Sequence, residues 1–351
     1  MAKYVGKNLA VEIVGESHSS EMKLSVKNFP KFKFDSEELK AFTNRRKATK
    51  SSFSTPRIEG DEPIFNGVID SVIDGDFDVI IKNNNVKSSD YNELFGKPRP
   101  SHADYSWYLK DGVLDFSGGG RFSARLTAPY CVLGGICKQY LNEKGIKIAS
   151  YLQAVGGVNG RSYKDGEPTY DEVIEKTKDF PALSSSKEML DEIEKTKSNG
   201  DSVGGVAEIV IYNLPAGIGN NLFEGLEGKL ASLLFSIPAV KGVEFGCGFD
   251  MAKSFGSHVN DELYYENEAI RLKTNNNGGI NGGISNGFNV TIRVAIKPTP
   301  SISLPQNTVD LVNKTNTTIK IKGRHDSCVA VRAVPCLESA VAIAILDEII
   351  G

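Results

Sequence analysis

Two long apolar segments with helical spacing constrain the fold more than any other feature of the sequence. They read SARLTAPYCVLGGICKQYLNEKG at residues 123–145 and CVAVRAVPCLESAVAIAILDEII at residues 328–350. A helix that is apolar on most of its surface must be buried. The longest uninterrupted apolar runs are shorter than the roughly 18 residues that suggest a membrane span. We therefore expect two helices in a protein core, with Pro335 starting or kinking the second.

Strand patterns alternate with these helices along the chain. Period-2 alternation predicts strands within residues 8–15 and 22–29, joined by a GESHSS turn, and others within residues 64–83, 204–213 and 288–298. Asp74-Gly75 is a candidate hairpin turn. No Pro/Ser-rich linker or change in composition divides the sequence. These patterns predict one α+β domain covering residues 1–351.

The overall charge argues against some classes of partner. A formal net charge of −3 gives no general attraction to nucleic acid or acidic membranes, so an anion site must be a local basic cluster. The N-terminus has no apolar run followed by a cleavage site, which predicts a cytoplasmic protein. The five cysteines and four histidines show no metal-binding spacing. We expect a small anionic ligand, no membrane, no nucleic acid and no metal.

Two glycine-rich segments, SGGGRFSAR at 117–125 and NNNGGINGGISNG at 275–287, are candidate cradles for an anion or cofactor. Tight turns explain the same glycines equally well. Arginines and lysines near these and other loops have side chains that suit phosphate and carboxylate oxygens, although single basic residues usually lie on a solvated surface. His18, His102 and Asp326 could transfer protons near neutral pH, or could be structural.

Several uncommon motifs occur in an order that resembles the chorismate synthase family. They are GESH at 15–18, HADY at 102–105, GGGRFSARLT at 118–127, and GRHDSC followed by RAVPCLES within 323–339. Blocks such as NGGINGGISNG and KPTPSI also resemble that family, so the similarity covers nearly the whole chain. The resemblance implies a β-α-β sandwich with central helices between antiparallel sheets, commonly assembled as a homotetramer.

The implied reaction is an anti-1,4-elimination of phosphate from 5-enolpyruvylshikimate 3-phosphate, which gives chorismate. This lyase reaction is the last common step of aromatic amino acid biosynthesis in the shikimate pathway. It requires reduced FMN although it involves no net redox change. An external flavin reductase system would supply the reduced flavin, unless the protein reduces its own flavin with NADPH.

The resemblance also implies roles for individual residues. His18 would donate a proton near the leaving phosphate, His102 would lie beside the flavin, and Asp326 would relay a proton, with Ser17 and Ser123 orienting this chemistry. The candidate substrate-binding residues are Arg46, Arg121, Arg125 and Arg332. The candidate FMN-binding residues are Arg121, Phe122, Ser123, Pro238, Ala239, Asn275, Gly282, Lys297, Pro298, Thr299, Pro300, Ser301 and Arg324.

The chain departs from the family pattern mainly between Lys47 and Ser52. The family commonly has Arg-Pro-Gly and a further basic residue there, and Lys50 could supply the missing charge. Two other classes of function remain open. One is a flavin- or NADPH-dependent oxidoreductase, although no dinucleotide fingerprint supports it. The other is a non-catalytic module that binds a phosphate ligand or RNA.

Overall fold

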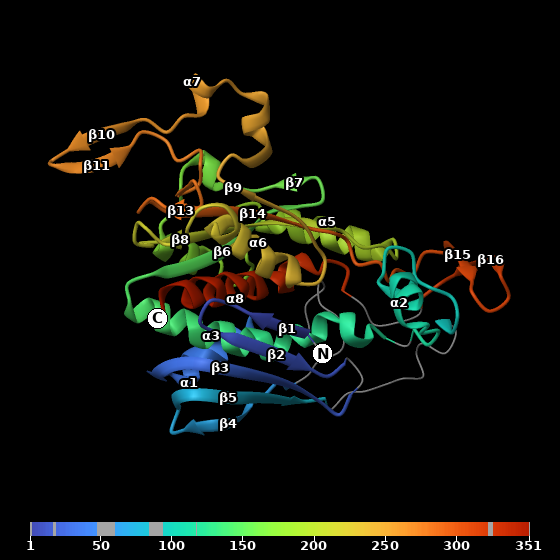
Figure 1. The fold of residues 1–351 in the computed structure, drawn as a ribbon. Helices are drawn as coiled ribbons and strands as arrows, with labels where there is room; N and C mark the ends of the chain where they lie inside the picture. The colour runs from blue at the N-terminus through green and yellow to red at the C-terminus, as the bar shows by residue number, and fades with distance from the viewer. Residues whose placement is uncertain are drawn as a thin grey trace.

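Helices lie between two antiparallel sheets in a three-layered arrangement (Figure 1). This computed structural model describes residues 2–16, 19–47, 60–83, 94–116, 118–321 and 326–350. The strand order is β1-β2-β3-β5-β4 in the first sheet and β7-β6-β8-β14-β9 in the second. Neighbouring strands are antiparallel in both sheets. The predicted α+β class, with central helices between antiparallel sheets, is confirmed.

The first sheet contains β1 (Ala2–Val5), β2 (Ala10–Val14), β3 (Glu21–Lys33), β4 (Ile64–Ile69) and β5 (Val72–Lys82). The second contains β6 (Lys147–Val155), β7 (Val158–Asn159), β8 (Gly205–Tyr212), β9 (Val240–Phe245) and β14 (Val290–Ile296). Short hairpins are formed by β10 (Leu263–Glu266) with β11 (Ala269–Leu272), β12 (Ile280–Asn281) with β13 (Ile284–Ser285), and β15 (Gln306–Asp310) with β16 (Thr315–Ile319). The α-helices are α1 (Ser36–Asn44), α2 (Asp104–Asp111), α3 (Thr127–Glu143), α4 (Tyr170–Lys176), α5 (Ser186–Ser198), α6 (Leu226–Ser236), α7 (Gly256–Val259) and α8 (Ala330–Ile349).

The two apolar segments form α3 and α8, which pack against each other in the middle layer. The α3 helix also contacts β3 and β5, while α8 contacts β6 and β8, so the pair joins the two sheets. Close packing depends on Gly134, where an added Cβ would lie 2.1 Å from the Cβ of Ser339 on α8. The prediction that both segments form buried helices is confirmed, because most residues of α3 and nearly all residues of α8 are buried.

A buried ion cluster ties three helices together. Glu338 on α8 accepts hydrogen bonds from Arg45 Nη2 at 2.7 Å, Lys138 Nζ at 2.5 Å and Ser150 Oγ at 2.9 Å. Burial alone would raise the pKa of Glu338, but the charges of Arg45 and Lys138 outweigh it and lower the pKa to about 2. Glu338 is therefore ionised at neutral pH, and its contacts fix α3 and the end of α1 against α8.

The structure differs from one local expectation and narrows another. Asp74-Gly75 lies inside β5, and the turn between β4 and β5 is formed by Asp70 and Ser71, which both have positive φ angles. The predicted hairpin turn was therefore wrong. Gly75 instead pairs with Phe29, where the register between β3 and β5 shifts, so it belongs to an irregularity of the sheet. Pro335 is the sixth residue of α8, so it does not start the helix, and a kink at this position stays a prediction.

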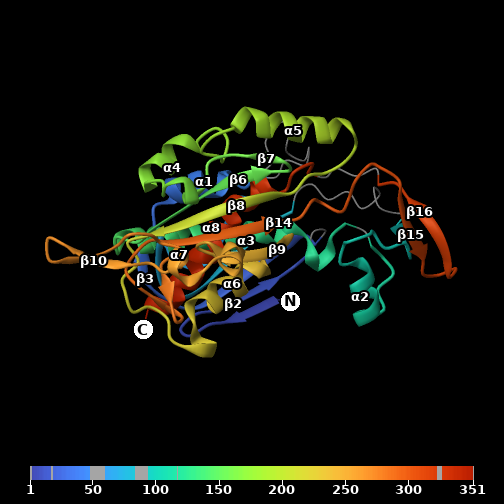
Figure 2. The same ribbon diagram turned by 90° about the horizontal axis from the view of Figure 1, so that it is seen from above.

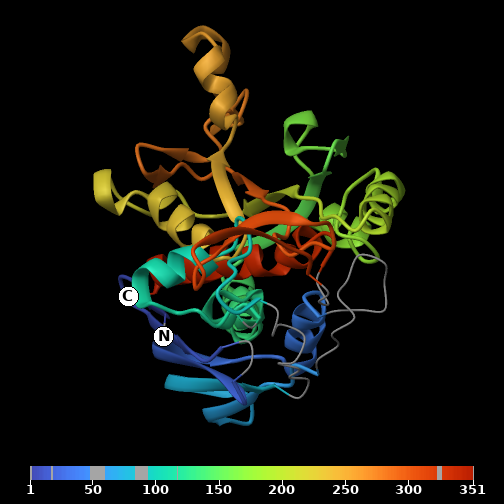
Figure 3. The same ribbon diagram turned by 90° about the vertical axis from the view of Figure 1, so that its right-hand side faces the viewer.

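Several elements extend from the layered body. The β10–β11 hairpin and the segment around α7 project from the second-sheet side (Figures 1 and 3). The α4 and α5 helices lie along one side of that sheet when the molecule is seen from above (Figure 2). Towards one end lie α2 and the β15–β16 hairpin. Within the described ranges, none of the helices is long and apolar enough to cross a membrane.

Candidate active site

A cavity of about 460 Å³ gathers segments that are far apart in the sequence. Its walls come from the residues preceding α2, the glycine-rich segment before α3, the end of α6 and the segment after β14. Ten residues predicted to act in catalysis or in ligand or cofactor binding line it: His102, Arg121, Phe122, Ser123, Pro238, Ala239, Lys297, Thr299, Pro300 and Ser301.

His102 is held by the first residue of α2. Its Nδ1 lies 2.5 Å from Oδ1 of Asp104. An ionised carboxylate only accepts hydrogen bonds, so this contact, which is shorter than the 3.2 Å between Nδ1 and Arg99 Nη2, assigns the proton of a neutral imidazole to Nδ1. Nε2 is then the ring nitrogen that can accept a proton from a ligand, or donate one after protonation.

Asp104 is buried together with Arg99. The carboxylate accepts hydrogen bonds from Arg99 Nε at 2.7 Å and Nη2 at 2.8 Å, and from the Arg99 backbone N–H at 3.0 Å. Burial alone would raise the pKa of Asp104, but hydrogen bonds from Arg99 and His102 outweigh it and lower the pKa to about 2. The group is therefore a carboxylate at neutral pH and keeps the imidazole in one orientation.

Arg121 lies against two aromatic rings that also contact each other. Its guanidinium carbon is 5.2 Å from the ring centroid of Trp107 and 5.2 Å from that of Phe122. Arg121 also forms an ion pair with Asp111 at the end of α2. Its contacts with the two rings keep a planar donor fork at the cavity, where it suits phosphate or carboxylate oxygens.

The segment after β14 contributes a second cation and a free hydroxyl. Lys297 Nζ donates to the carbonyl oxygen of Ser101 at 2.5 Å, and burial together with the charge of Lys241 lowers the pKa of Lys297. Thr299 Oγ1 is buried and has no hydrogen-bond partner among the described residues. A buried hydroxyl without a partner is costly, so this atom is well placed to bind an oxyanion.

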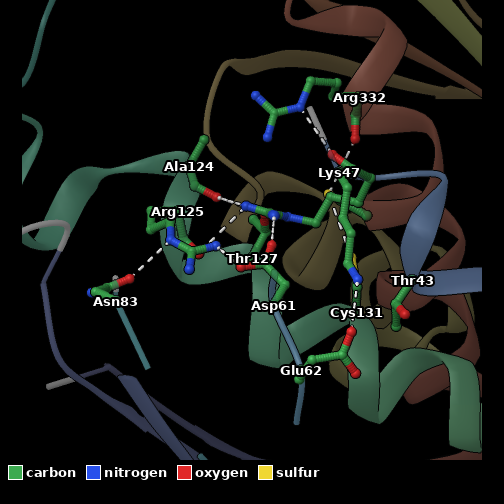
Figure 4. A network of polar contacts seen from close by, with 12 residues as sticks. Thr43, Lys47, Asp61, Glu62, Asn83, Ala124, Arg125, Thr127, Cys131 and Arg332 are labelled. Carbon is green, nitrogen blue, oxygen red and sulfur yellow. Dashed lines mark hydrogen bonds and ion pairs between the residues drawn. The ribbon is translucent and has the colours of Figure 1, made fainter. Parts of the chain in front are cut away.

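Arg46 and Arg125 lie behind the cavity wall, where Asp61 bridges them. Asp61 Oδ2 accepts from Arg46 Nη1 at 3.1 Å, and Oδ1 accepts from Arg125 Nη1 (Figure 4). Arg46 also donates to Thr127 Oγ1 at 2.7 Å and to the carbonyl oxygen of Ala124 at 3.0 Å. Both arginines are therefore fixed by contacts within the protein.

Arg332 connects this cluster to Asp326. Its Nη1 lies 2.9 Å from Asp326 Oδ2, and its Nε donates to the backbone oxygen of Arg46 at 2.9 Å. Asp326 is thus held by an ion pair. It does not cap α8, because the N-cap residue of that helix is Val329. The predicted proton relay, Asp326, and three of the four predicted substrate arginines, Arg46, Arg125 and Arg332, belong to one connected network.

Some predicted residues lie elsewhere. Asn275 and Gly282 are not among the described residues that line the 460 Å³ cavity. The Asn275 side chain binds its own glycine-rich loop, accepting from the N–H of Gly279 at 2.8 Å and donating to the oxygen of Asn289 at 2.9 Å. Pro298 joins two lining residues without being one of them. Ser17, His18 and Arg324 lie outside the described residues.

Three carboxylates of the site escaped the sequence reasoning: Asp61, Asp104 and Asp111. The HADY motif contains Asp104, and its position two residues after His102 was an available signal. Nothing in the local sequence of Asp61 or Asp111 indicates an arginine partner. Both pairs form through tertiary contacts.

A second, mainly apolar cavity of about 280 Å³ adjoins the first and shares Arg121, Ser123, Ser236 and Pro238 with it. Its other walls come from β1, β2, α3, α6 and α8. The two cavities together place an apolar surface beside the cationic one. This combination suits a ligand with an apolar ring and an anionic group.

Comparisons with known proteins agree on one family. The family model described as chorismate synthase matches residues 9–350. The chorismate synthase of Methanococcus aeolicus is 42% identical, with 99% of this chain and 96% of that protein covered. That of Thermococcus kodakarensis is 40% identical, with 98% and 97% covered. A crystal structure of a chorismate synthase superposes with a TM-score of 0.75 at 26% identity, covering 98% of this chain and 92% of that one. The chain therefore belongs to the chorismate synthase family of carbon–oxygen lyases.

Proposed function

We propose that the protein converts 5-enolpyruvylshikimate 3-phosphate into chorismate and phosphate by an anti-1,4-elimination that requires reduced FMN. This would be the last common step of aromatic amino acid biosynthesis. The family membership supports the reaction class. The observation that carries the proposal is the gathering of His102, Arg121 and Lys297 around one cavity.

The cationic side chains suit a substrate with two carboxylates and a phosphate. Arg121 offers a planar fork, and Lys297 offers a point charge on another wall of the cavity. As the carbon–oxygen bond breaks, negative charge builds up on the oxygen of the departing phosphate. Cations placed at that oxyanion stabilise the transition state more than the ground state.

The cavity residues also fit FMN. Lys297 and the hydroxyls of Thr299 and Ser301 can bind its phosphate, and the unpaired Thr299 Oγ1 is the structural feature that favours this. When bound, reduced FMN would supply electron density that assists the breaking of the carbon–oxygen bond. The Phe122 ring and the Pro238–Ala239 segment present apolar surface for a flat ring system.

Three described residues would handle protons or orient the reacting groups. His102 would act through Nε2, because Asp104 engages Nδ1. Asp326 would relay the ring proton while Arg332 holds its carboxylate. Ser123 lines both cavities and would orient the bound groups by hydrogen bonding. By resemblance, His18 and Ser17 would act at the leaving phosphate and Arg324 at the flavin.

Further parts of the proposal concern the setting of the enzyme. The chain would act as a single domain, assembled as a homotetramer in the cytoplasm. A separate reductase system would supply the reduced flavin. These points rest on the resemblance to the family.

The test is an anaerobic assay of purified protein with the substrate and photoreduced FMN, in which phosphate and chorismate are measured in the same samples. We expect equal amounts of both products, and none with oxidised FMN. If folded protein forms neither product, the proposed lyase activity is wrong.

A second arm distinguishes the alternatives. Oxidised FMN and NADPH are added in the dark without a reductase, and we expect no flavin reduction and no product. Reduction of FMN in this arm would instead show that the protein reduces its own flavin. Flavin and substrate binding without phosphate release in the first arm would support a non-catalytic ligand-binding protein.

A further inference from the structure

Asp61 is a buried carboxylate to which neither the sequence patterns nor the reaction assigns a role. It lies three residues before β4, and its side chain is 8% exposed. One oxygen accepts from Arg46, just after α1, and the other from Arg125, just before α3. A single side chain thus joins three separate parts of the chain.

The two arginines need such a partner. The exposed fractions of the Arg46 and Arg125 side chains are 5% and 8%. Two buried guanidiniums beside each other repel, and leaving a buried charge without a partner is strongly unfavourable. The bridging carboxylate removes most of that repulsion and fixes both groups in direction.

Through Arg46, Asp61 supports the wall of the cavity. Arg46 Nη2 donates to the carbonyl oxygen of Ala124, and Arg46 Nε donates to Thr127 Oγ1. Ala124 itself lines the cavity beside Ser123. If Arg46 were to move, the turn that holds both lining residues would lose two of its anchors.

Through the Arg46 backbone, the same carboxylate is connected to the proton-handling side of the site. The Arg46 carbonyl accepts from Arg332 Nε, and Arg332 Nη1 holds Asp326 (Figure 4 shows Arg332 beside this cluster). Asp61 does not line the cavity itself. Through Arg46 it is connected to the wall that holds Ser123, and through Arg46 and Arg332 it is connected to Asp326.

We propose that Asp61 is a positioning residue for the lyase reaction: acting through Arg46, it holds the Ser123–Ala124 wall and the Arg332–Asp326 pair in their reactive arrangement. This inference rests on the proposed function. Its effect should fall on turnover, because Asp61 contacts neither Arg121 nor Lys297, two of the cations that line the cavity. Small displacements of reacting groups can cost about 100-fold in rate.

The test variant is Asp61→Asn. Asn is nearly the same size and tolerates the φ of +51° found at this position, so the backbone conformation can be retained while the charge is lost. The matched control is Glu62→Gln, which removes the neighbouring carboxylate. Glu62 is 73% exposed and lies 3.6 Å from Lys47. Both variants are assayed as full-length protein with reduced FMN.

For Asp61→Asn we expect kcat to fall by about 10- to 100-fold, with KM and the calorimetric Kd of the substrate within about threefold of wild type. Glu62→Gln should change none of these by more than about twofold. An unchanged kcat in Asp61→Asn would overturn the proposal. A lower substrate Kd would also overturn it, because Asp61 would then compete with the substrate for its arginines. A substrate Kd raised by more than about threefold would make Asp61 a binding residue and would overturn it as well.

A second measurement does not depend on activity. Amide hydrogen exchange should accelerate by at least about tenfold in residues 121–127 and 326–332 of Asp61→Asn, and stay unchanged in the distant α5 helix. Uniform acceleration, or none, would overturn the positioning role. If the wild type shows no lyase activity, the proposed function is wrong. The hydrogen-exchange result for residues 121–127 and 326–332 would still show whether Asp61 holds these two segments in place. If Asp61→Asn does not fold, Arg46→Lys, which keeps the charge but loses the fork, is measured in the same way.

Discussion

Asp104→Asn should reverse the hydrogen bonding of His102. The carboxylate accepts the Nδ1 proton, whereas an amide that turns its NH2 group toward the ring donates to Nδ1. The imidazole would then carry its proton on Nε2, the nitrogen left for the ligand. The amide oxygen would then lie at the position of Oδ2 and could still accept from Arg99 Nε, but the NH2 group at the position of Oδ1 would face the Arg99 Nη2 donor, which loses its acceptor.

The expected magnitudes follow from these contacts. A correctly placed general acid or base typically contributes about 10²–10⁴-fold to the rate, so both His102→Ala and Asp104→Asn should lower kcat on that scale. Asp104→Asn should also destabilise the fold, because Arg99 is buried and would lose its ionised partner. Loss of one member of a buried ion pair typically costs about 3–5 kcal/mol of unfolding free energy.

The assay is a double-mutant cycle. The initial rate of anaerobic phosphate release is measured for wild type, His102→Ala, Asp104→Asn and the double variant, and is normalised to the folded fraction from circular dichroism. If Asp104 acts through His102, the double variant should be no more than about threefold slower than His102→Ala. The control is Asp78→Asn, which removes a carboxylate paired with Lys23 on the first sheet and should keep the wild-type rate. The reasoning would be refuted if the double variant were slower than His102→Ala by the full factor that Asp104→Asn alone costs in the wild-type background.

Two further predictions concern the middle layer. Glu338→Gln should lower the unfolding free energy at pH 7 by about 3–5 kcal/mol, because Lys138 stays buried without its carboxylate. The folded pKa of Glu338, about 2, lies below its ordinary value of 4.5, so its stabilisation is complete above about pH 4.5 and is lost as the pH falls toward 2. Urea unfolding at several pH values should therefore show that the unfolding free energy of the variant falls less steeply between pH 4.5 and pH 2 than that of the wild type. Equal slopes of unfolding free energy against pH for the two proteins would contradict this. Gly134→Ala should lower the unfolding free energy by about 1–3 kcal/mol, because the new Cβ would collide with α8. The control is Gly228→Ala on α6, where an added Cβ meets nothing within 4 Å and should not destabilise the protein. Equal thermal midpoints for the two variants would contradict the packing argument.

The sequence was most informative where one local pattern determined the outcome. Residues 123–145 and 328–350 are apolar on most of their surface, and a core between two sheets is the place where such helices can be buried on all sides. The hairpin prediction failed for the opposite reason. Asp-Gly is a favourable turn pair, but Gly75 has a positive φ angle inside a continuous strand, where pairing with β3 decides the structure.

The two glycine-rich segments show how similar composition can have different uses. Gly118 and Gly119 of the first segment line the cavity. In the second, an added Cβ at Gly278 would lie 2.4 Å from the backbone nitrogen of Gly246, so this glycine permits close packing of two backbone segments. Composition alone could not separate these uses, because both require the absence of a Cβ.

The arrangement of charges explains how an acidic chain can hold a cationic site. Most of the candidate arginines are paired with carboxylates: Arg121 with Asp111, Arg46 and Arg125 with Asp61, and Arg332 with Asp326. Lys297 differs, because it donates to a backbone carbonyl, and burial lowers its pKa. An anion that approaches Lys297 relieves the cost of burying that charge, whereas an anion at a paired arginine must share the arginine with a carboxylate. The sequence identified these cations as a set, but their different capacities for a ligand depend on partners that only the folded chain brings together.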